Sequence, residues 1–305
     1  MRALFLTGAS GLIGRSLLAR LAGSKRAGGK DGLPVVALSR NVGAAPEPNA
    51  TFVRGDLLSP ASYERELAGA DTVVHLAALT GKASAAEHFR VNADGTEALV
   101  EACRRAGVRR FLFVSSIAAT YPDVRAYPYA QSKQKAEKIV RASGLDWAIL
   151  RPTLVFGKRS PIWRSLASLA KLPLVPVFGS GSVRVQPVFV DDVAEAIATW
   201  MEDENLRSAA FDVGGPDVLT FEELLRRMHR ALKGGEARVV HLPAKSLIPL
   251  LARLEKPLLP LLPLTAGQLH SFVHDSTAQS NELLSRLAPR MTGVERMLEV
   301  LSRNG

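Results

Sequence analysis

Three glycines close to the start of the chain restrict its fold more than any other feature. An apolar run at residues 4–6 leads into Gly8, Gly11 and Gly14, and a helix-patterned segment covers residues 12–21. A strand that turns into a helix in this way directs the unpaired N–H groups of the first helical turn outward, where they form an anion site. Gly8 permits the turn, Gly11 permits a pyrophosphate to approach the backbone, and Gly14 permits close helix–strand packing. The stretch predicts a dinucleotide-binding unit.

The chain is long and apolar enough to bury a substantial core. It has 305 residues, 47% of them apolar, which fits one large domain or two small ones. Its one cysteine, Cys103, excludes an intramolecular disulfide and favours a reducing, intracellular compartment. The N-terminus enters a strand directly, without the basic and apolar regions of a signal peptide. We therefore expect a cytoplasmic protein.

The chain is basic, with a formal net charge of +10 and a pI of about 10. The Lys and Arg residues are scattered and form no stripe with interleaved aromatic residues, so no nucleic-acid partner is predicted. The most lipophilic stretch, residues 246–264, contains four prolines and three charges, which a membrane-spanning helix does not tolerate. We interpret it as a substrate-side lid or packed helix pair; contact with a membrane or a partner complex is the alternative and is not expected.

Strand and helix patterns alternate along the first half of the chain. This alternation requires a parallel sheet with right-handed crossovers and helices on both faces. The predicted fold is α/β, a doubly wound parallel sheet of the Rossmann type with a smaller C-terminal substrate-side subdomain. We assign residues 1–157 to the dinucleotide-binding core and 158–305 mainly to the substrate side, with 183–215 returning to the core. Strands are predicted at 35–38, 51–54, 71–76, 109–114 and 146–150, with helices at 87–106 and 129–141.

The end of the second predicted strand bears on the choice of cofactor. In dinucleotide folds this position faces the adenosine ribose, where an acidic residue accepts a hydrogen bond from the 2′-hydroxyl and an arginine suits a 2′-phosphate. The sequence here is Ser39, Arg40, Asn41, with an arginine and no acid. NADP(H) is therefore predicted in preference to NAD(H), which stays the alternative.

Two further strand ends carry residues suited to a cofactor. Asp56 and Leu57 follow the third strand, where the turn chemistry places Asp56 beside an adenine amino group. Ala77 and Ala78 follow the fourth strand, and their small side chains let the backbone pass close to a cofactor.

Tyr129 and Lys133 form the strongest catalytic pattern, with Ser116 at the end of the fifth strand. The two residues are four apart on a predicted helix and share one face. Tyrosine alone is a poor acid or base near neutral pH, since its ordinary pKa is about 10. A lysine cation favours the phenolate, and a serine hydroxyl can hold the substrate oxygen in the same hydrogen-bond network. Such a pair is usually a solvated helix face, but its place at the carboxyl edge of the sheet favours catalysis.

Eight motifs follow one another along the chain up to about residue 215. They lie at residues 7–14, 55–57, 75–78, 91–96, 114–116, 129–133, 151–157 and 188–194. In this order they resemble the extended or atypical short-chain dehydrogenase/reductases of the NAD-dependent epimerase/dehydratase group.

The resemblance implies a catalytic set and a cofactor site. Ser116, Tyr129 and Lys133 would be catalytic, and Lys133 would also touch the nicotinamide ribose. Asn92 would lie at the active-site end of its helix, and the backbone of residues 153–155 beside the nicotinamide. The cofactor-binding residues expected in total are Thr7, Gly8, Ser10, Gly11, Leu12, Ile13, Gly14, Ser39, Arg40, Asn41, Asp56, Leu57, Leu76, Ala77, Ala78, Asn92, Val114, Tyr129, Lys133, Pro152, Thr153 and Val155.

Within this group the pattern at residues 179–181, 185–192 and 264–268 is most similar to the nucleotide-binding accessory subunit of respiratory complex I and its bacterial relatives. The predicted activity is an NADP(H)-dependent oxidoreductase that transfers a hydride between nicotinamide and a carbonyl or alcohol substrate. Two alternatives stay open. One is a binding or assembly protein that holds NADPH as a structural element. The other is a nucleotide-sugar-type epimerase or dehydratase, for which the loop between residues 116 and 129 is short.

The segment after the sixth strand is predicted to build the substrate side, beginning with a helix that has Ser160 as its N-cap and Pro161 in its first turn. The tail at 265–301 predicts short helices that pack around the same side. Three histidines lack partners at metal-ligand spacing, so no metal is predicted; they are His241, His270 and His274. Candidates for substrate contact, each more often structural when taken alone, are Lys158, Arg159, Trp163, Arg184 and Gln186.

Overall fold

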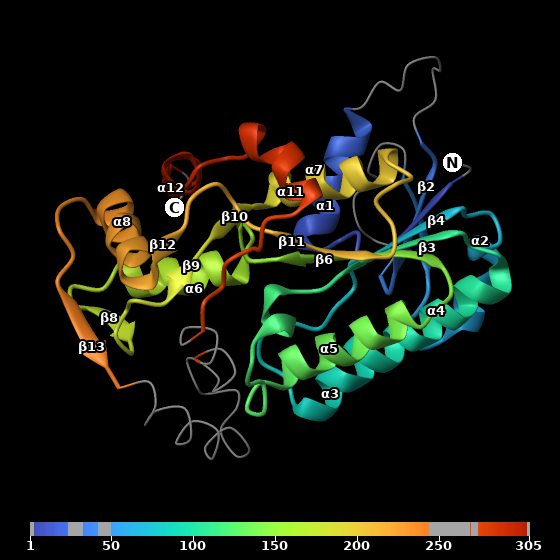
Figure 1. The fold of residues 1–305 in the computed structure, drawn as a ribbon, viewed down its shortest axis with the longest axis horizontal. Coiled ribbons are helices and arrows are strands. Elements are labelled where there is room, and N and C mark those ends of the chain that lie inside the picture. Colours follow the sequence, from blue (N-terminus) through green and yellow to red (C-terminus); the bar gives the residue numbers. More distant parts are fainter. Residues whose placement is uncertain (1–2, 24–32, 42–49, 244–268, 270–273, 304–305) are drawn as a thin grey trace.

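A parallel sheet forms the centre of the molecule (Figure 1). The computed structural model describes residues 3–23, 33–41, 50–243, 269 and 274–303. Among these, seven strands lie in the order β3-β2-β1-β4-β5-β6-β11, with every neighbouring pair parallel. This order reverses between β1 and β4, as in the Rossmann fold predicted from the sequence. The strands are β1 (Leu4–Thr7), β2 (Val35–Ser39), β3 (Ala50–Arg54), β4 (Thr72–His75), β5 (Arg110–Val114), β6 (Asp146–Pro152) and β11 (Ala209–Val213).

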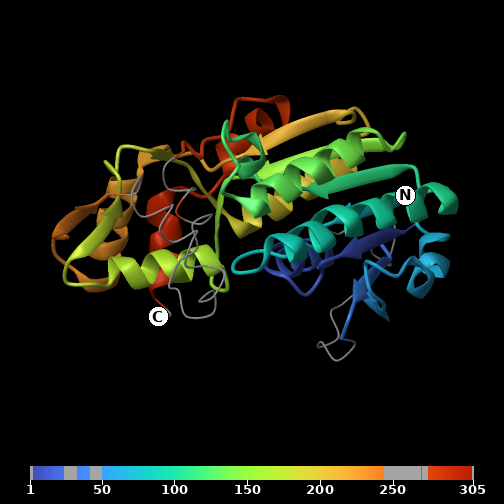
Figure 2. The same cartoon turned by 90° about the horizontal axis from the view of Figure 1, so that it is seen from below.

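Helices cover both faces of this sheet (Figures 1 and 2). One face carries α1 (Leu12–Ala22), α7 (Val190–Glu202) and α11 (Glu282–Leu287), with α7 packed against both of the others. The opposite face carries α2 (Glu64–Leu67), α3 (Ala85–Phe89), α4 (Gly95–Ala106) and α5 (Pro128–Arg141). Short 3-10 helices at Pro60–Ser62, Ile117–Thr120 and Ala288–Arg290 complete the connections.

The two faces of the sheet bury separate apolar cores. In β1, Leu4 and Leu6 pack with the α1 and α7 side, whereas Phe5 packs with the α4 and α5 side, and all three are fully buried. Successive side chains of a strand point to opposite faces, so a strand covered on both sides must be apolar throughout. This explains why the strands appear in the sequence as short continuous apolar runs. Cys103 lies in the second core and is fully buried.

A smaller lobe with its own core lies beside the carboxyl ends of the strands (Figure 2). Trp163 of the lobe packs edge-on against Phe156, with ring centroids 5.4 Å apart. Three two-stranded sheets accompany the lobe: β7 pairs with β10, β9 with β12, and β8 with β13. Its elements are β7 (Leu154–Phe156), α6 (Pro161–Ala170), β8 (Val175–Phe178), β9 (Arg184–Val185), β10 (Pro187–Phe189), β12 (Leu219–Thr220), α8 (Phe221–Lys233), β13 (Val239–Leu242) and α12 (Val294–Ser302).

The helix predicted at 87–106 is interrupted. It begins earlier, at Ala85, with Ser84 and Glu87 forming a capping box, and it passes through a π-helical turn at Arg90–Asp94 before α4. Such turns are frequent at functional sites. The predicted tail helices exist as α11 and α12, but one packs on the sheet core and the other on the C-terminal lobe.

The division of the tail helices has a local cause. Helix α12 packs on α8 of the lobe, whereas α11 packs on α7 and β11 of the core, contrary to the prediction that the whole tail surrounds the substrate side. Asn281 caps α11, accepting from the Leu284 N–H at 2.9 Å, and its side-chain amide donates to the Asp212 carbonyl of β11 at 2.8 Å. The stretch 246–264 lies outside the described residues. Within the described ranges, no helix is both long and apolar enough to cross a membrane.

Arg110 anchors the end of α7 to the sheet from a buried position. Only 2% of the residue is exposed, and its guanidinium donates to the carbonyls of Trp200, Met201 and Asp203 at 2.9–3.1 Å. It also lies over the Trp200 ring, 4.3 Å from the centroid. The last carbonyls of a helix have no intrahelical partner, so the side chain supplies what the helix lacks.

We expect Arg110→Met to lower the free energy of unfolding by about 3 kcal/mol, because it leaves buried carbonyls without donors. Chemical denaturation followed by circular dichroism measures this change. Arg104→Met, at an exposed position of α4, is the control and is expected to change stability by less than about 0.5 kcal/mol. Equal effects of the two substitutions would contradict the anchoring role.

Candidate functional site

The loop between β1 and α1 is closely packed through its glycines. Gly8 has a φ of +73°, the left-handed conformation that favours glycine, and a Cβ there would lie 2.6 Å from the Ala77 nitrogen. A Cβ at Gly14 would lie 2.3 Å from the Gly8 carbonyl oxygen. Gly11 occupies the N-cap of α1 and has no side chain to cap it. The N–H groups of the first helical turn are therefore left for an anionic ligand.

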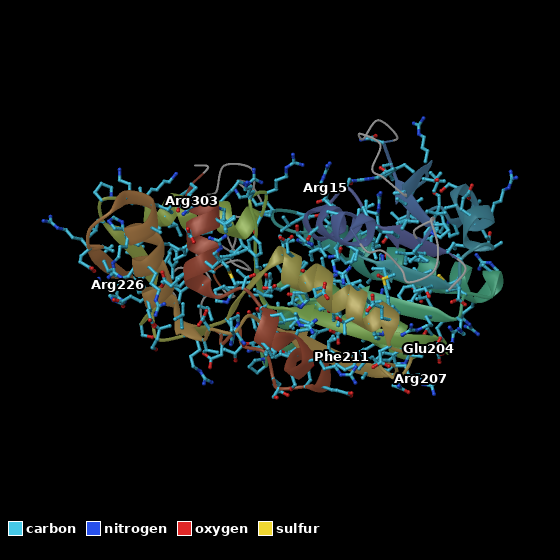
Figure 3. All side chains as sticks on the ribbon, turned by 90° about the horizontal axis from the view of Figure 1, so that it is seen from above. Arg15, Glu204, Arg207, Phe211, Arg226 and Arg303 are labelled. Atoms are coloured by element: carbon cyan, nitrogen blue, oxygen red, sulfur yellow. The ribbon has the colours of Figure 1, made fainter. Side chains whose placement is uncertain are left out.

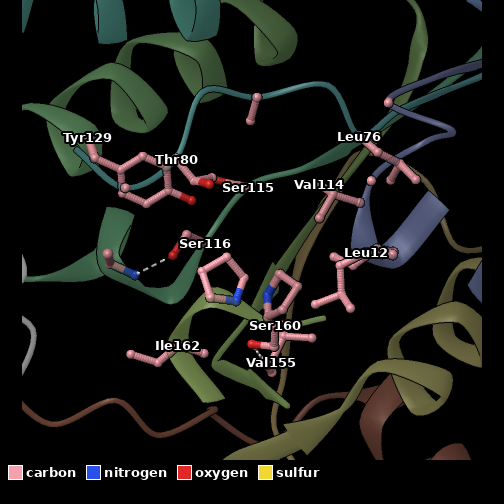
Figure 4. A pocket seen from close by; sticks show the side chains of 18 of the residues that line it. Leu12, Leu76, Thr80, Val114, Ser115, Ser116, Tyr129, Val155, Ser160 and Ile162 are labelled. Atoms are coloured by element: carbon pink, nitrogen blue, oxygen red, sulfur yellow. Dashed lines mark hydrogen bonds between the residues drawn. The ribbon is translucent and has the colours of Figure 1, made fainter. Parts of the chain in front are cut away.

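A cavity of about 1090 Å³ connects this loop with the C-terminal lobe. It lies at the carboxyl edge of the sheet, the side on which open α/β sheets bind ligands, and its size is at the upper end for small-molecule sites. Figure 4 shows side chains from the loop, the strand ends and the lobe facing this space. The predicted cofactor residues that line it are Gly8, Ser10, Gly11, Leu12, Ile13, Gly14, Leu76, Ala78, Val114, Tyr129, Pro152, Thr153 and Val155.

Ser116 and Tyr129 both line the cavity (Figure 4). Ser116 follows β5, and its hydroxyl accepts a hydrogen bond from the Ala118 N–H at 3.2 Å. Tyr129 stands in the first turn of α5, against the rings of Tyr127 and His88 at centroid distances of 5.7 and 5.9 Å. Burial raises the pKa of Tyr129 to about 12, while a hydrogen bond with Ser116 acts in the opposite direction. The phenol is therefore held protonated at neutral pH.

Lys133 is buried behind the cavity wall. It is 2% exposed, its Nζ donates to the Val114 carbonyl at 2.8 Å, and it lies 4.4 Å from the centroid of the Phe113 ring. Burial lowers the pKa of Lys133 to about 7, although the negative charge of Glu137 offsets part of this effect. Within the described chain, Lys133 neither lines the cavity nor hydrogen-bonds to Tyr129. The side chain follows the interface between α5 and β5, where the strand carbonyl is its acceptor.

Asn92 lies in the π-helical turn and fixes the start of α5. Its Oδ1 accepts from the Leu79 N–H at 2.7 Å, and its Nδ2 donates to the Leu79 carbonyl and to Ser132 Oγ, both at 3.0 Å. Ser132 in turn donates to the Tyr129 carbonyl at 2.7 Å. Asn92 was predicted to bind cofactor; the structure places it behind the cavity wall, where it positions the turn that carries Tyr129.

Thr7 belongs to a buried chain of polar side chains under the same edge of the sheet. Its hydroxyl lies 2.6 Å from Nδ1 of His75, whose Nε2 lies 3.0 Å from the Thr96 hydroxyl. The Ala77 N–H donates to Thr7 at 3.2 Å. Burial, with a smaller contribution from the charge of Lys133, lowers the pKa of His75 to about 3. Thr7 and Ala77 therefore shape the turn after β4 and do not themselves line the cavity.

The residues predicted to bind the adenosine end lie apart from the main cavity. Arg40 is exposed at the end of β2, next to Ser39, whose hydroxyl donates to the Asn41 carbonyl at 2.9 Å. Asp56 accepts from the Leu58 N–H at 2.9 Å, so its carboxylate closes its own turn. Leu57 is buried in the core under α4. The cavity as formed ends before these residues.

Of the five predicted substrate contacts, Arg159 lines the cavity. Lys158 is exposed away from it, and Trp163 is buried in the lobe core, where it packs on Phe156. Arg184 pairs with Asp275 at 2.9 Å on the surface. Trp163 and Arg184 are used to assemble the lobe, so these two predictions were wrong, whereas Lys158 is exposed and does not line the cavity.

Gln186 is likewise structural, and it is part of a connection to the C-terminal segment. Its Oε1 accepts from the Ala278 N–H at 2.8 Å, and its Nε2 donates to the Gly215 carbonyl. Residues 274–281, called here the return segment, also reach the cavity wall: the hydroxyls of Ser276 and Tyr121 are hydrogen-bonded, and the Tyr121 ring packs on His274. Tyr121 lines the cavity. The return segment therefore supports the site from outside.

The predicted absence of metal ligands concerned three histidines. His241 lies 3.2 Å from Glu222, His274 is the ring against Tyr121, and His270 lies outside the described residues. No cluster of three or more potential metal ligands occurs in the part of the chain that the structure describes.

Many residues that line the cavity carry no signal in the sequence. Tyr127 and Pro128 directly precede Tyr129 in the sequence, and this adjacency could have indicated that they line the cavity. Arg15 was also missed; Figure 3 shows it on α1, at the end of the core nearer the lobe. The missed lining residues are Arg15, Thr80, Gly81, Ala83, Ser84, Ala85, Ala86, His88, Ser115, Ile117, Ala118, Tyr121, Tyr127, Pro128, Ser160, Pro161, Ile162 and Ser165.

The fold and the glycine loop define a protein of the Rossmann dinucleotide-binding class, with serine, tyrosine and lysine at its carboxyl edge. A family model described as NAD dependent epimerase/dehydratase family matches residues 4–214. The chain belongs to this family.

Similar proteins include a reductase and a respiratory-chain subunit. The chain is 33% identical over 243 residues to Ceramide reductase of Caulobacter vibrioides, covering 78% of this chain and 73% of the reductase. It is 28% identical over 211 residues to the mitochondrial NADH-ubiquinone oxidoreductase 40 kDa subunit of Neurospora crassa, covering 68% of this chain and about half, 54%, of the subunit. The structure of MoeE5 in complex with UDP-glucuronic acid and NAD matches with a TM-score of 0.74 at 23% identity over 99% of both chains, which shows the shared fold.

Gly8→Ala is expected to weaken dinucleotide binding at least tenfold, because the added Cβ would displace the backbone of the β4 turn from the loop. Quenching of protein fluorescence during titration with NADPH and NADH measures the affinity. Gly107→Ala is the control: Gly107 also has a positive φ, of +72°, but a Cβ there meets nothing within 4 Å. It is expected to cost about 1 kcal/mol of stability with no change of affinity. An unchanged affinity in Gly8→Ala would contradict this loop as the cofactor site.

Proposed function

We propose that this chain is an NADP(H)-dependent oxidoreductase that transfers a hydride between nicotinamide and a carbonyl or alcohol carbon. The observation that carries the proposal is that Tyr129 and Ser116 face the same cavity as the glycine loop and the Pro152–Val155 backbone. A proton donor and a nicotinamide site in one cavity is the arrangement that carbonyl reduction needs.

The chemistry of the two side chains favours the reducing direction. Bound reduced nicotinamide supplies the hydride to the carbonyl carbon. Ser116 donates a hydrogen bond to the carbonyl oxygen and orients it, and Tyr129 gives its phenolic proton to that oxygen, so that the ketone becomes an alcohol. The raised pKa of Tyr129 keeps this proton on the phenol until negative charge develops on the substrate oxygen. The phenol then regains a proton from solvent.

The lining of the cavity supports a substrate with an apolar body. Its lining includes the side chains of Ile117, Tyr121, Leu154 and Ile162, and among the described lining residues the arginines are Arg15 and Arg159. Aliphatic chains gain free energy from contact with such apolar side chains. The similarity to Ceramide reductase supports the same proposal. We therefore propose a ketone carried on an aliphatic, amphiphilic molecule.

Tyr129→Phe is expected to reduce the rate of NADPH-dependent ketone reduction at least a hundredfold, since it removes the proton donor. NADPH oxidation with long-chain ketones, followed by absorbance, measures the rate, and fluorescence titration is expected to give nearly unchanged cofactor affinity. Tyr63→Phe removes a buried hydroxyl that donates to the Leu57 carbonyl and serves as the control with full activity. Full turnover in Tyr129→Phe would refute the assigned role.

Arg40 carries the proposed preference for NADP(H). It is exposed at the end of β2 and makes no hydrogen bond or ion pair with any other described residue, so its guanidinium is available to a 2′-phosphate. Arg40→Ala is expected to weaken NADPH binding about tenfold and to leave NADH binding nearly unchanged. Arg65→Ala, an exposed arginine on α2, is the control. A parallel loss for both cofactors would remove the basis for the preference.

A second candidate function is that of a cofactor-holding assembly protein, which the similarity to the respiratory-chain subunit favours. It would retain NADPH tightly and oxidise none with any ketone. An epimerase or dehydratase would instead form product without net consumption of NADPH. The stoichiometry of NADPH to product therefore separates the three functions.

A further inference from the structure

Lys133 presents a physical problem that its immediate contacts do not solve. An ammonium group that is 98% buried loses its hydration, which disfavours the charged form strongly. Its described contacts are one carbonyl, that of Val114, and the face of the Phe113 ring. An ammonium has three donors, and a carbonyl and a ring quadrupole offset only part of the lost hydration. An anion nearby is needed if the group is to stay charged.

Glu137 is the buried anion one helical turn from Lys133; it forms no hydrogen bond or ion pair with Lys133 among the described contacts, so its charge acts through space. Tyr129, Lys133 and Glu137 are spaced four residues apart along α5, so each lies one helical turn beyond the last on the same face. Lys133 and Glu137 are both buried, although α5 as a whole is amphipathic and carries exposed charges elsewhere. A buried carboxylate on this face is costly unless it is paired, so its presence requires an explanation.

Two arginines hold Glu137 in its ionised form. Arg151 on β6 donates to both carboxylate oxygens, at 2.8 and 2.6 Å, and Arg141 on the next turn of α5 donates at 2.9 Å. The Glu137 side chain is 4% exposed, against 18% for Arg151 and 38% for Arg141. Burial raises the pKa of Glu137, but its bonds to Arg151 outweigh this and leave the pKa below its ordinary value. The carboxylate is therefore a fixed negative charge.

The other titratable groups around Lys133 do not replace it. His75 on β4 is neutral, because burial lowers its pKa to about 3. Tyr129 on the same helix is a neutral phenol, and Arg151 on β6 is a cation. Asp212 on β11 lies beyond Arg151, 3.6 Å from its guanidinium. Among these described groups, Glu137 is the negative charge on the lysine's own helix face.

We propose that Glu137 is a positioning residue that favours the charged form of Lys133 behind the nicotinamide end of the cavity, with the Arg151 pair fixing the carboxylate. Lys133 in turn stabilises the negative charge left on Tyr129 after proton transfer. This role rests on the proposed oxidoreductase function, but the charge state of Lys133 can be measured without turnover.

The test is a direct titration of Lys133 by NMR. The full chain is labelled with ¹³C at lysine Cε, whose chemical shift reports protonation of Nζ, and the Lys133 signal is assigned by its loss in Lys133→Arg. Glu137→Gln is expected to move the titration midpoint of Lys133 to lower pH by about one unit, because it removes the anion. Arg151→Gln is expected to move it to higher pH, because it removes a neighbouring cation and leaves Glu137 paired with Arg141.

The opposite directions distinguish charge from damage to the fold. Both variants break the same buried pair, so a purely structural role predicts shifts of equal sign or none, and either result overturns the proposal. Should Glu137→Gln fail to fold, an unchanged midpoint in Arg151→Gln alone overturns it. Asp94→Asn is the matched control: Asp94 pairs with Lys135 of the same helix at 2.9 Å, but both are about half exposed, and no shift is expected at Lys133.

The pH dependence of ketone reduction gives an independent second readout. The basic limb of the rate profile is expected to follow the Lys133 midpoint, to lower pH in Glu137→Gln and to higher pH in Arg151→Gln, with Glu137→Asp restoring the limb of the original protein. Opposite midpoint shifts with no turnover in any variant would refute the oxidoreductase function and leave the role of Glu137 intact. Turnover with an unshifted Lys133 midpoint would refute the role of Glu137 and leave the oxidoreductase function intact.

Discussion

The close approach of α1 to the edge between β1 and β4 is the contact on which the site depends. Gly14 lies against the Gly8 carbonyl, and Gly8 lies against the backbone at Ala77, at distances that admit no Cβ. The same helix is held from outside by α7, through Ser16 with Asp191 at 2.6 Å and an ion pair of Arg20 with Glu195. Segments more than 170 residues apart thereby fix the direction of the N–H groups that face the cavity.

The fold was predictable because its signals are local. A strand buried on both faces must be an apolar run, and a loop that passes under a helix must use glycine, so both are visible in a few consecutive residues. The side chains that complete the cavity are set by contacts distant in sequence. In the sequence Gln186 resembles a substrate contact, but in the structure its side chain accepts a hydrogen bond from the Ala278 N–H. Lys133 is directed to the Val114 carbonyl by the packing of α5 on β5. No periodicity encodes these choices.

Burial favours the neutral form of each titratable group around the site. Burial makes Tyr129 harder to deprotonate, lowers the affinity of Lys133 for its proton, and keeps His75 neutral. All three effects have the same cause, the loss of hydration behind the cavity wall. These side chains therefore carry little charge before a ligand binds. In the proposed reduction, the charge that develops on the substrate oxygen would meet a low-dielectric environment, in which fixed dipoles and the charged form of Lys133 act strongly.

The return segment has a consequence for how the protein is made. The family match ends at residue 214, yet Ser276 holds Tyr121 of the cavity wall and Ala278 holds Gln186. During synthesis the sheet emerges from the ribosome first, with its glycine loop complete, while one wall of the cavity still lacks its outer support. The return segment is translated after the sheet, so Tyr121 of the cavity wall obtains its outer support only once Ser276 has emerged.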